Sequence, residues 1–513
     1  MDSVPLSLPG LTANTPPHKP SWASVLSVWL PALVILAGIA LRITLLGVDM
    51  RLHPDEALFA AQARLASHGG DVLLRETDLD KPPLTIYTTA LSFRLLGTSE
   101  FAARLPNTLF SVLSLAVLYA LAHALYTDRS VATLATVLWA LSPYDLAFAA
   151  TVFTDVQATF WVLVGALFAA RDRWWAAGFA LGLVFASKTN GMVFLPLVLA
   201  LGIARHARHD WRVWDVVRRV RNLLIPLVMV IGTVTLWDAA RHPRSYWDLN
   251  VARNNPGRLV RAAELWPRLD DWAHWLHYMT GSAVVNVALL AGGGLWLVWG
   301  LRTRKRGTAL DWLLAGFGVA FMGWYWLVAL NTYDRYLHTL TPFALVLAAQ
   351  IVWGVASTLG DRLPGSQSVV QIGVVGLVVV LMLPGIMPVL RGEAEIGGDQ
   401  HQHDGIDALA EYLNTELSGA VIYDHWLGWE LAYYLGESSR VTLVYMPLPE
   451  ALADDVAAQS AIRYFVAPSE QHAAPWIAEL ERRNIAVTTI YTAEFVVYQI
   501  GLGTTTSTHL YSG

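Results

Sequence analysis

The sequence contains no cysteine in 513 residues, and charged residues make up only 15% of the chain. Without cysteine, disulfide bonds, thiolate metal sites and cysteine nucleophiles are excluded. Soluble proteins carry about a quarter charged residues, whereas this chain is 55% hydrophobic, with a mean hydropathy of +0.44. The composition therefore indicates a polytopic membrane protein. A formal net charge of -5, with the basic residues dispersed, argues against a nucleic-acid partner.

Long apolar runs follow one another from residue 24 to residue 391. A membrane-spanning helix needs roughly 20 apolar residues, and the sequence predicts about eleven spans: 24–47, 104–126, 131–149, 156–171, 174–188, 190–205, 222–240, 282–301, 309–330, 337–358 and 368–390. The predicted fold of 24–391 is an all-α polytopic membrane domain. Residues 1–23 are polar and rich in proline and serine, which predicts a disordered cytoplasmic tail without a cleavable signal.

The distribution of lysine and arginine predicts the orientation. With a cytoplasmic N-terminus, the dense basic loops 205–221 and 302–306 both face the cytoplasm, as the positive-inside rule requires. The loop 241–281 then lies outside, although it carries Arg241, Arg244, Arg253, Arg258, Arg261 and Arg268. We expect an amphipathic interfacial helix there, anchored by Trp266, Trp272 and Trp275; the alternative is a site for anionic lipid or phosphate. The expected location is the plasma membrane.

The chain changes character after residue 391, and an odd number of spans places this part outside the cytoplasm. Helical periodicity over 404–417, 450–459 and 473–483 alternates with strand-like segments at 420–423, 441–445, 462–467 and 495–500. This alternation predicts a small extracytoplasmic α/β domain at 400–513. No glycine-rich phosphate fingerprint follows a strand, so nucleotide binding is not predicted. His401 and His403 are metal ligands or, more simply, solvated linker residues.

An acidic pair, Asp55 and Glu56, follows the first span within the predicted outer loop 48–103. Carboxylates near hydrocarbon lose hydration and need partners, which makes the pair a functional hypothesis; the alternative is that it only caps the next helix. Other unusual polar residues on the same predicted face are Asp80, Lys81, Arg104, Asp155, Lys188, Asp334, Arg335 and Tyr336. Such cations suit phosphate oxygens and such carboxylates suit proton transfer, unless the cations are ordinary interfacial side chains.

Six motifs in this order sharpen the hypothesis: His53-Pro54-Asp55-Glu56, Asp80-Lys81-Pro82-Pro83-Leu84, Ala103-Arg104-Leu105-Pro106-Asn107, Phe153-Thr154-Asp155, Lys188-Thr189-Asn190-Gly191, and Arg335-Tyr336-Leu337 followed by Pro342. Through them, residues 40–350 resemble the GT-C glycosyltransferases of the protein O-mannosyltransferase and aminoarabinose-transferase kind (glycosyltransferase family 39-like). The resemblance implies an enzyme of the bilayer that transfers a sugar from a polyprenyl-phosphate donor. The acceptor would be a hydroxyl of a glycan, lipid or protein at the outer face, and inversion is expected.

The resemblance also implies roles for single residues. Asp55 would be the catalytic base, with Glu56 beside it shaping the site, and Asp155 would lie in the sugar or acceptor pocket. The expected substrate-binding residues are Lys81, Arg104, Lys188, Arg335 and Tyr336. A lipid phosphate leaves with the help of cations rather than a protein acid, so a single base is sufficient for an inverting transfer.

No cofactor is certain from the sequence, and two other functions are open. Some relatives carry a metal near the position of Asp80, so Asp80 with His274 or His277 could hold a divalent ion; the alternative is that both histidines are interfacial. A transporter or flippase of lipid-linked substrates would show charges near the membrane midplane and an internal repeat, and neither is evident. A non-catalytic scaffold with a partner-binding outer domain is the third hypothesis.

Overall fold

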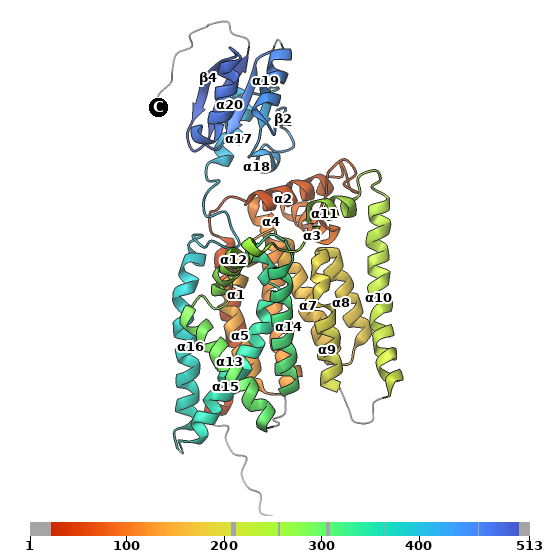
Figure 1. Cartoon of the computed structure of the whole chain (residues 1–513), viewed down its shortest axis with the longest axis vertical. Coiled ribbons are helices and arrows are strands. Elements are labelled where there is room, and N and C mark those ends of the chain that lie inside the picture. The colour runs from red at the N-terminus through yellow and green to blue at the C-terminus, as the bar shows by residue number, and fades with distance from the viewer. Residues whose placement is uncertain are drawn as a thin grey trace, which may run out of the picture.

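The computed structural model describes residues 22–206, 212–254, 257–303, 308–363, 365–459 and 461–501, without the side chains of 22–28 and 303. The predicted tail therefore lies outside the described residues except for Trp22 and Ala23, which begin the first helix. The basic run at 304–306 also lies outside them. Figure 1 shows an upright bundle of helices with a smaller sheet-containing domain above it.

Eight helical segments of the described chain are long and apolar enough to span a membrane. They are α1 (Trp22–Leu46), α4 (Glu100–Tyr126), η1 (Thr189–Phe194) with α9 (Leu195–His206), α10 (Val213–Ala239), α13 (Ala283–Thr303), α14 (Thr308–Leu327), α15 (Thr341–Asp361) and α16 (Gln367–Leu390). A ninth would be α5 (Arg129–Ala140) with α6 (Pro143–Ala149), bent by 56°. The chain is a multi-pass membrane protein.

Two further apolar helices, α7 (Thr154–Ala170) and α8 (Trp174–Ser187), have 17 and 14 residues. Each of the eleven predicted spans coincides with one of these segments. The count of eleven is nevertheless not confirmed, because α7 and α8 are shorter than a full crossing requires.

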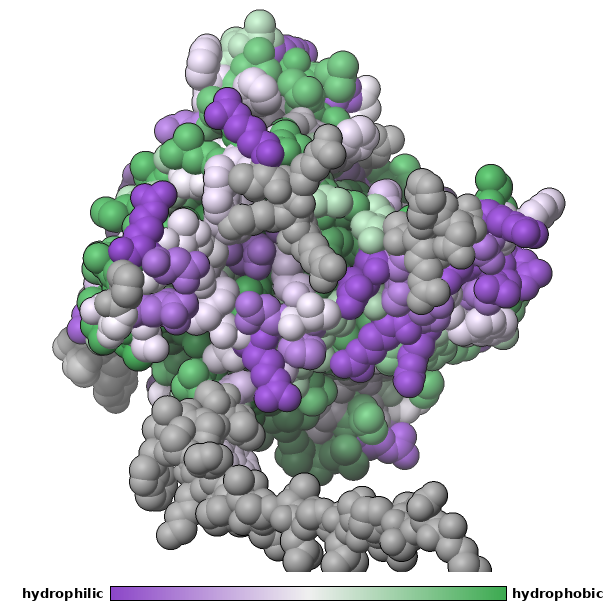
Figure 2. All heavy atoms as spheres, turned by 90° about the horizontal axis from the view of Figure 1, so that it is seen from below, coloured by the Kyte–Doolittle hydropathy of each residue, from purple (hydrophilic) through white to green (hydrophobic). Residues whose placement is uncertain are grey.

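Basic residues gather at the end of the bundle opposite the sheet domain. There Arg205, at the end of α9, donates to the Ala124 carbonyl near the end of α4 (2.6 Å), and Arg219 of α10 pairs with Asp172 at the α7–α8 junction (2.7 Å). Figure 2 looks onto this end and shows long hydrophilic side chains around its rim. The helix ends that carry the predicted cytoplasmic cations therefore lie together.

Short helices cover the other end of the bundle, beneath the sheet domain (Figure 1). They are α2 (Pro54–Ser67), α3 (Pro83–Leu96), α11 (Tyr246–Asn254), η2 (Ala262–Glu264), α12 (Leu265–His277) and η3 (Asp334–Leu337). The predicted helix in 241–281 is present, but its anchors were partly wrong. Trp266 is exposed, whereas Trp272 is buried and Trp275 donates to the Thr332 carbonyl (2.8 Å).

The arginines of this region are also not all free surface cations. Arg241 is fully buried and donates to the Leu74 and Thr77 carbonyls at 2.9 and 2.7 Å. Arg268 donates to carbonyls in the last turn of α14 and just after it, among them those of Tyr325 (2.6 Å) and Leu330 (2.7 Å). They bind backbone groups because the loops here need partners for their carbonyls.

The C-terminal domain is a five-stranded sheet in the order β2-β1-β3-β5-β4, in which β2, β1 and β3 are parallel and β5 is antiparallel to both neighbours. Its elements are α17 (Ile406–Glu416), β1 (Val421–Asp424), α18 (Gly428–Tyr434), β2 (Thr442–Tyr445), α19 (Pro449–Ala458), β3 (Arg463–Ala467), α20 (Glu470–Arg482), β4 (Ala486–Thr492) and β5 (Val496–Gly501). Helices α17 and α18 pack in one core cluster, and α19 and α20 in another. The predicted helices and strands are confirmed, whereas α18 and β4 were missed.

Candidate active site

The motif around Asp55 forms the first turn of α2. The His53 Nδ1 accepts a hydrogen bond from the Asp55 amide (3.2 Å), the Glu56 Oε2 accepts one from the His53 amide (3.1 Å), and Pro54 occupies the first helical position. The capping interpretation therefore holds for Glu56, and the functional interpretation of Asp55 stays a prediction. Glu56 caps the helix, while the Asp55 carboxylate contacts the guanidinium of Arg335 (Oδ2 to Nη1, 2.9 Å).

Asp55 lines a partly open cavity at the covered end of the bundle. Its walls are formed by residues far apart in the sequence: Asp55, Phe59, Lys81, Phe153, Thr154, Asp155, Lys188, Asn190, Asn250, Asn254, Arg335 and Tyr336. The structure thus brings together six of the predicted catalytic and substrate-binding residues, namely Asp55, Lys81, Asp155, Lys188, Arg335 and Tyr336. We call this space the polar cavity.

Each cation of the polar cavity has a carboxylate partner. Lys81 contacts Asp80 (2.8 Å), Lys188 contacts Asp155, and Arg335 contacts Asp55. Aromatic faces hold two of these cations in addition: the Lys188 Nζ lies 5.0 Å from the Tyr336 ring centroid, and the Arg335 Cζ lies 5.3 Å from that of Phe153. The lining therefore holds three cations and two acids, and the third carboxylate, that of Asp80, balances the charge from outside the cavity.

Glu56 and Arg104, which were predicted to belong to the same site, do not line this cavity. Glu56 is fully buried and accepts a hydrogen bond from the Val152 amide (2.8 Å), with the Arg104 Nε at 3.7 Å. Burial raises the pKa of the Glu56 carboxyl to about 7, although Arg104 and two backbone amides lower it. A carboxylate so enclosed by its capping bonds supports the turn and does not face a substrate.

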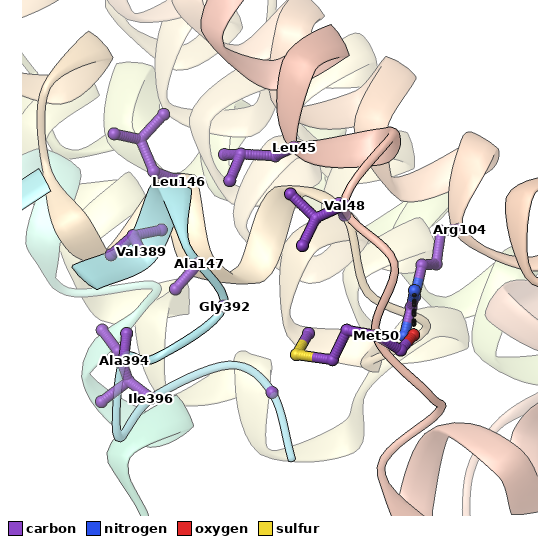
Figure 3. Close-up of a pocket in the computed structure, with 12 residues that line it drawn as sticks. Leu45, Val48, Met50, Arg104, Leu146, Ala147, Val389, Gly392, Ala394 and Ile396 are labelled. Carbon is purple, nitrogen blue, oxygen red and sulfur yellow. Dashed lines mark hydrogen bonds between the residues drawn. The ribbon is translucent and has the colours of Figure 1, made fainter. Parts of the chain in front are cut away.

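Arg104 binds the chain that leads into α2. It donates to the carbonyls of Met50 (2.8 Å) and Arg51 (3.0 Å). Figure 3 shows its side chain beside Met50 at the edge of a second pocket, whose other walls are mostly apolar. The prediction that Arg104 lies with Lys81 around a donor phosphate is therefore not met by this geometry.

The predicted metal ligands Asp80, His274 and His277 are also apart. Asp80 lies between Lys81 and Arg253 (3.7 Å), while His274 contacts Glu395 (2.7 Å). In the described ranges, no group of three or more histidine, aspartate and glutamate side chains is arranged to hold a metal ion. His403 is not a solvated linker residue, because it lies between Asp399 (3.2 Å) and Glu430 (2.8 Å).

Sequence reasoning missed the asparagines of α11. Asn250 and Asn254 line the polar cavity, and the Asn250 amide donates to the Asp80 carbonyl (2.6 Å). The signal was their spacing of four residues, which places both on one face of a helix. The arginines, tryptophans and histidines of this loop gave no indication that α11 lines the cavity.

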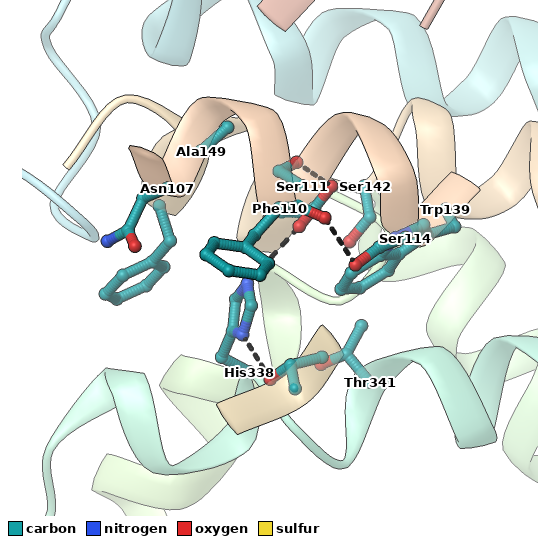
Figure 4. Close-up of polar contacts among 12 residues, drawn as sticks. Asn107, Phe110, Ser111, Ser114, Trp139, Ser142, Ala149, His338 and Thr341 are labelled. Carbon is teal, nitrogen blue, oxygen red and sulfur yellow. Dashed lines mark hydrogen bonds and ion pairs between the residues drawn. The ribbon is translucent and has the colours of Figure 1, made fainter. Parts of the chain in front are cut away.

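A second polar group, which we call the buried cluster, lies behind the polar cavity. The Asp145 Oδ2 accepts hydrogen bonds from Arg42 (Nε, 3.1 Å) and Ser111 (2.7 Å), and its Oδ1 lies 3.4 Å from the His338 Nε2. The other nitrogen of His338 contacts Thr159 (2.8 Å). Figure 4 shows the His338 ring reaching toward α4, which carries Ser111. Since His338 follows Arg335 by one turn, this cluster supports a wall of the cavity.

Comparisons with known proteins agree with this architecture. The family model for dolichyl-phosphate-mannose-protein mannosyltransferase matches residues 80–237. An undecaprenyl phosphate-alpha-4-amino-4-deoxy-L-arabinose arabinosyl transferase of Pectobacterium atrosepticum is 25% identical over 365 residues, which cover 65% of this chain and 61% of the relative. A second such transferase, from Pseudomonas fluorescens, is 27% identical over 46% of this chain and 44% of its own. The chain thus spans less than two thirds of the curated relatives it matches.

Solved structures extend the likeness to nearly the whole chain. ArnT from Cupriavidus metallidurans in the apo state matches with a TM-score of 0.64 at 15% identity, covering 93% of this chain and 98% of its own. The same protein bound to undecaprenyl phosphate gives 0.61, with 93% and 97% covered at 15% identity. The Archaeoglobus fulgidus oligosaccharyltransferase gives 0.53 at 12% identity, with 88% and 70% covered.

The resemblance drawn from the motifs is confirmed. The fold is shared with ArnT and with the archaeal oligosaccharyltransferase. In sequence, the chain is similar to the protein mannosyltransferases over residues 80–237 and to the aminoarabinose transferases over 65% of its length.

Proposed function

We propose that this protein is a membrane glycosyltransferase that moves a sugar from a polyprenyl-phosphate donor to an acceptor hydroxyl. The observation that carries the proposal is the polar cavity, in which Lys81, Lys188 and Arg335 surround Asp55 and Asp155. Three cations suit the phosphate of such a donor, because phosphate oxygens accept charge-assisted hydrogen bonds. The relatives named above use, by their names, an undecaprenyl-phosphate sugar.

Asp55 is the proposed base. It removes the proton from the acceptor hydroxyl as the oxygen forms a bond to the anomeric carbon, and the bond from that carbon to the phosphate oxygen of the lipid breaks. Inversion follows from a single displacement. Arg335 orients the Asp55 carboxylate, and the cavity cations stabilise the leaving phosphate. Lys188, Asp155 and Tyr336 contact one another in the same cavity, where the sugar and the phosphate would lie.

The orientation is part of the proposal. The arginine-rich end of the bundle is cytoplasmic, so the polar cavity and the C-terminal domain lie beyond the outer face of the plasma membrane. In this arrangement all eleven predicted spans cross the membrane, α7 and α8 being the short ones. The lipid bilayer supplies the donor, and a glycan, lipid or protein supplies the hydroxyl.

The test is a transfer assay of the purified protein in lipid nanodiscs against a panel of polyprenyl-phosphate sugars, with mass spectrometry of the products. We expect covalent transfer from at least one donor, and a loss of about 10²- to 10⁴-fold in Asp55→Asn, the range in which general-base catalysis contributes. Asp78→Asn is the matched control, because this carboxylate lies in the same loop, is 67% exposed and does not line the cavity. Full transfer by Asp55→Asn would remove the proposed base.

The same assay separates the enzyme from a transporter. A transporter would move lipid-linked sugar between leaflets without a covalent product. Arg42 and Asp145 do form a charged pair inside the bundle, but Arg42 lies about one turn from the end of α1 rather than at its middle. The pair therefore gives no support to a midplane transport site.

A further inference from the structure

The helix that carries Asp55 is held from above by the C-terminal domain. Figure 1 shows α18 at the lower side of that domain, next to α2. Arg64 of α2 is only 7% exposed and donates to the carbonyls of Ala432 (2.7 Å) and Tyr433 (2.6 Å). These carbonyls belong to the last turn of α18, where helical carbonyls have no partner within the helix. One side chain thus joins the two helices and satisfies the end of α18.

A second contact lies at the beginning of α2. The hydroxyl of Tyr434 accepts a hydrogen bond from the Leu52 amide (2.8 Å) and donates one to the Glu100 Oε1 (2.5 Å). Leu52 is fully buried and immediately precedes the N-cap residue His53. The tyrosine therefore fixes the chain three residues before Asp55, and the partner it uses at Glu100 belongs to the first turn of α4.

The linker that leads into the C-terminal domain adds contacts at the same junction between α2 and that domain. His403 contacts Glu430 of α18 and Asp399 of the linker, and Glu430 is fully buried. Arg51, just before Leu52, contacts Glu100 (3.3 Å) and Asp407 of α17 (3.2 Å). The segment that leads into α2 is thus bound by two helices of the other domain.

Resting on the proposed function, we propose that the C-terminal domain positions the first turn of α2, and with it the Asp55 carboxylate, and that Tyr434 is the positioning residue. A general base must lie within hydrogen-bond reach of the hydroxyl it deprotonates, and a displacement of about 1 Å costs about 10²-fold in rate. The capping box fixes Asp55 relative to Leu52. Holding Leu52 from outside the bundle therefore holds the base.

The test compares Tyr434→Phe with Tyr433→Phe in the full chain. Tyr434→Phe removes both hydroxyl contacts, whereas the hydroxyl of the neighbouring Tyr433 makes no hydrogen bond to any described residue, so Tyr433→Phe is the matched control. Two quantities are measured on each protein in nanodiscs: steady-state transfer, and amide hydrogen exchange of the peptide covering 48–60.

For Tyr434→Phe we expect kcat to fall about 10-fold or more while KM for the donor stays within about 2-fold, because the cations of the polar cavity are untouched. Exchange in 48–60 should become faster by about 10-fold, with an unchanged melting temperature of the whole protein. Tyr433→Phe should match the wild type in both. Should Tyr434→Phe fail to fold, Arg64→Gln loosens α2 from its other end and should reduce kcat in the same selective way.

Unchanged exchange in Tyr434→Phe overturns the inference, and so does faster exchange with an unchanged kcat. An effect that appears only in KM also overturns it. If the wild type transfers no sugar from any donor, the proposed function fails instead. The exchange comparison then still decides whether the C-terminal domain holds the first turn of α2.

Discussion

The polar cavity and the buried cluster contain the same chemical groups in opposite surroundings. Asp55 and Arg335 are 22% and 18% exposed, whereas Asp145 and Arg42 are 1% and 0% exposed. In the cavity, the Asp55–Arg335 pair has one side turned to open space that a ligand can enter, whereas the Lys188 and Asp155 side chains are only 10% and 3% exposed. In the cluster, Ser111 and His338 complete the surroundings of the carboxylate. Charge near the membrane therefore does not identify a site by itself; what sets Asp55 and Arg335 apart from Asp145 and Arg42 is that they are exposed to the cavity.

The largest expected effect is on stability, and it should differ between the buried cluster and the polar cavity. Asp145→Ala leaves the buried Arg42 guanidinium without its carboxylate, and removing one partner of a buried pair costs about 3 to 5 kcal/mol. We expect a clear drop in the melting temperature of the protein in detergent, with a much smaller drop for Asp55→Asn, since Asp55 is partly exposed. Equal melting temperatures for the two variants would contradict the distinction.

A double variant sharpens this prediction. Replacing the pair together, as Arg42→Met with Asp145→Leu, removes both charges from the interior. Apolar replacements of buried ion pairs are often neutral or stabilising, so the double variant should recover much of the stability that Asp145→Ala loses. Failure to recover would mean that the contacts of Ser111 and His338 to Asp145, rather than the charge pair, stabilise this region.

The next largest effect is on transfer activity, and it should be confined to residues that line the polar cavity. Lys188 lines the polar cavity and contacts Asp155, so Lys188→Gln removes a cation and leaves an unpaired acid facing the donor phosphate. We expect kcat/KM for the donor to fall about 100-fold, which corresponds to about 2.7 kcal/mol, and the melting temperature to fall as well, because the Lys188 and Asp155 side chains are only 10% and 3% exposed. Arg244→Gln is the control, because Arg244 is half exposed, lies at the same end of the bundle and does not line the cavity. Similar losses in both variants would argue for a general effect of surface charge.

Much of the polar cavity could be predicted, because motif order and predicted topology together placed six of its residues on one face of the membrane. The predictions that were wrong concern residues whose side-chain direction is determined by local geometry. Glu56 follows Asp55 directly, yet the capping box turns it into the protein while Asp55 faces the cavity. Arg104 was placed on the correct end, but the carbonyls of Met50 and Arg51 determine where its guanidinium points.

Other features depended on contacts between distant parts of the chain. Asn250 reaches the carbonyl of Asp80, which is 170 positions earlier, and no local pattern encodes such a contact. Helix α18 has only seven residues, too few for helical periodicity to appear, and β4 lies at the sheet edge with largely exposed side chains. The contact of α18 with α2 therefore could not be predicted, although the domain itself could.

The smallest expected effect lies at the junction of the two domains, where His403 is intermediate in exposure between the cavity and the cluster, at 16%. Burial by itself would lower the pKa of this imidazole. The carboxylates of Asp399 and Glu430 outweigh that effect and raise the pKa to about 9. Because this folded-state pKa exceeds the ordinary value of about 6.5, the ion pairs stabilise the fold fully below pH 6.5, and their contribution is lost as the pH rises through 9.

The measurement is the difference in melting temperature between the wild type and His403→Gln from pH 6 to pH 10. That difference should be largest near pH 6 and should shrink toward pH 10, by the equivalent of about 2 kcal/mol. His472→Gln, at an exposed histidine of the same domain, is the matched control. A difference that stays constant over this range would mean that His403 stabilises the junction by packing alone. The C-terminal domain would then be held on α2 by Arg64 and Tyr434, whose contacts to α18 and α2 do not depend on an ionisable imidazole.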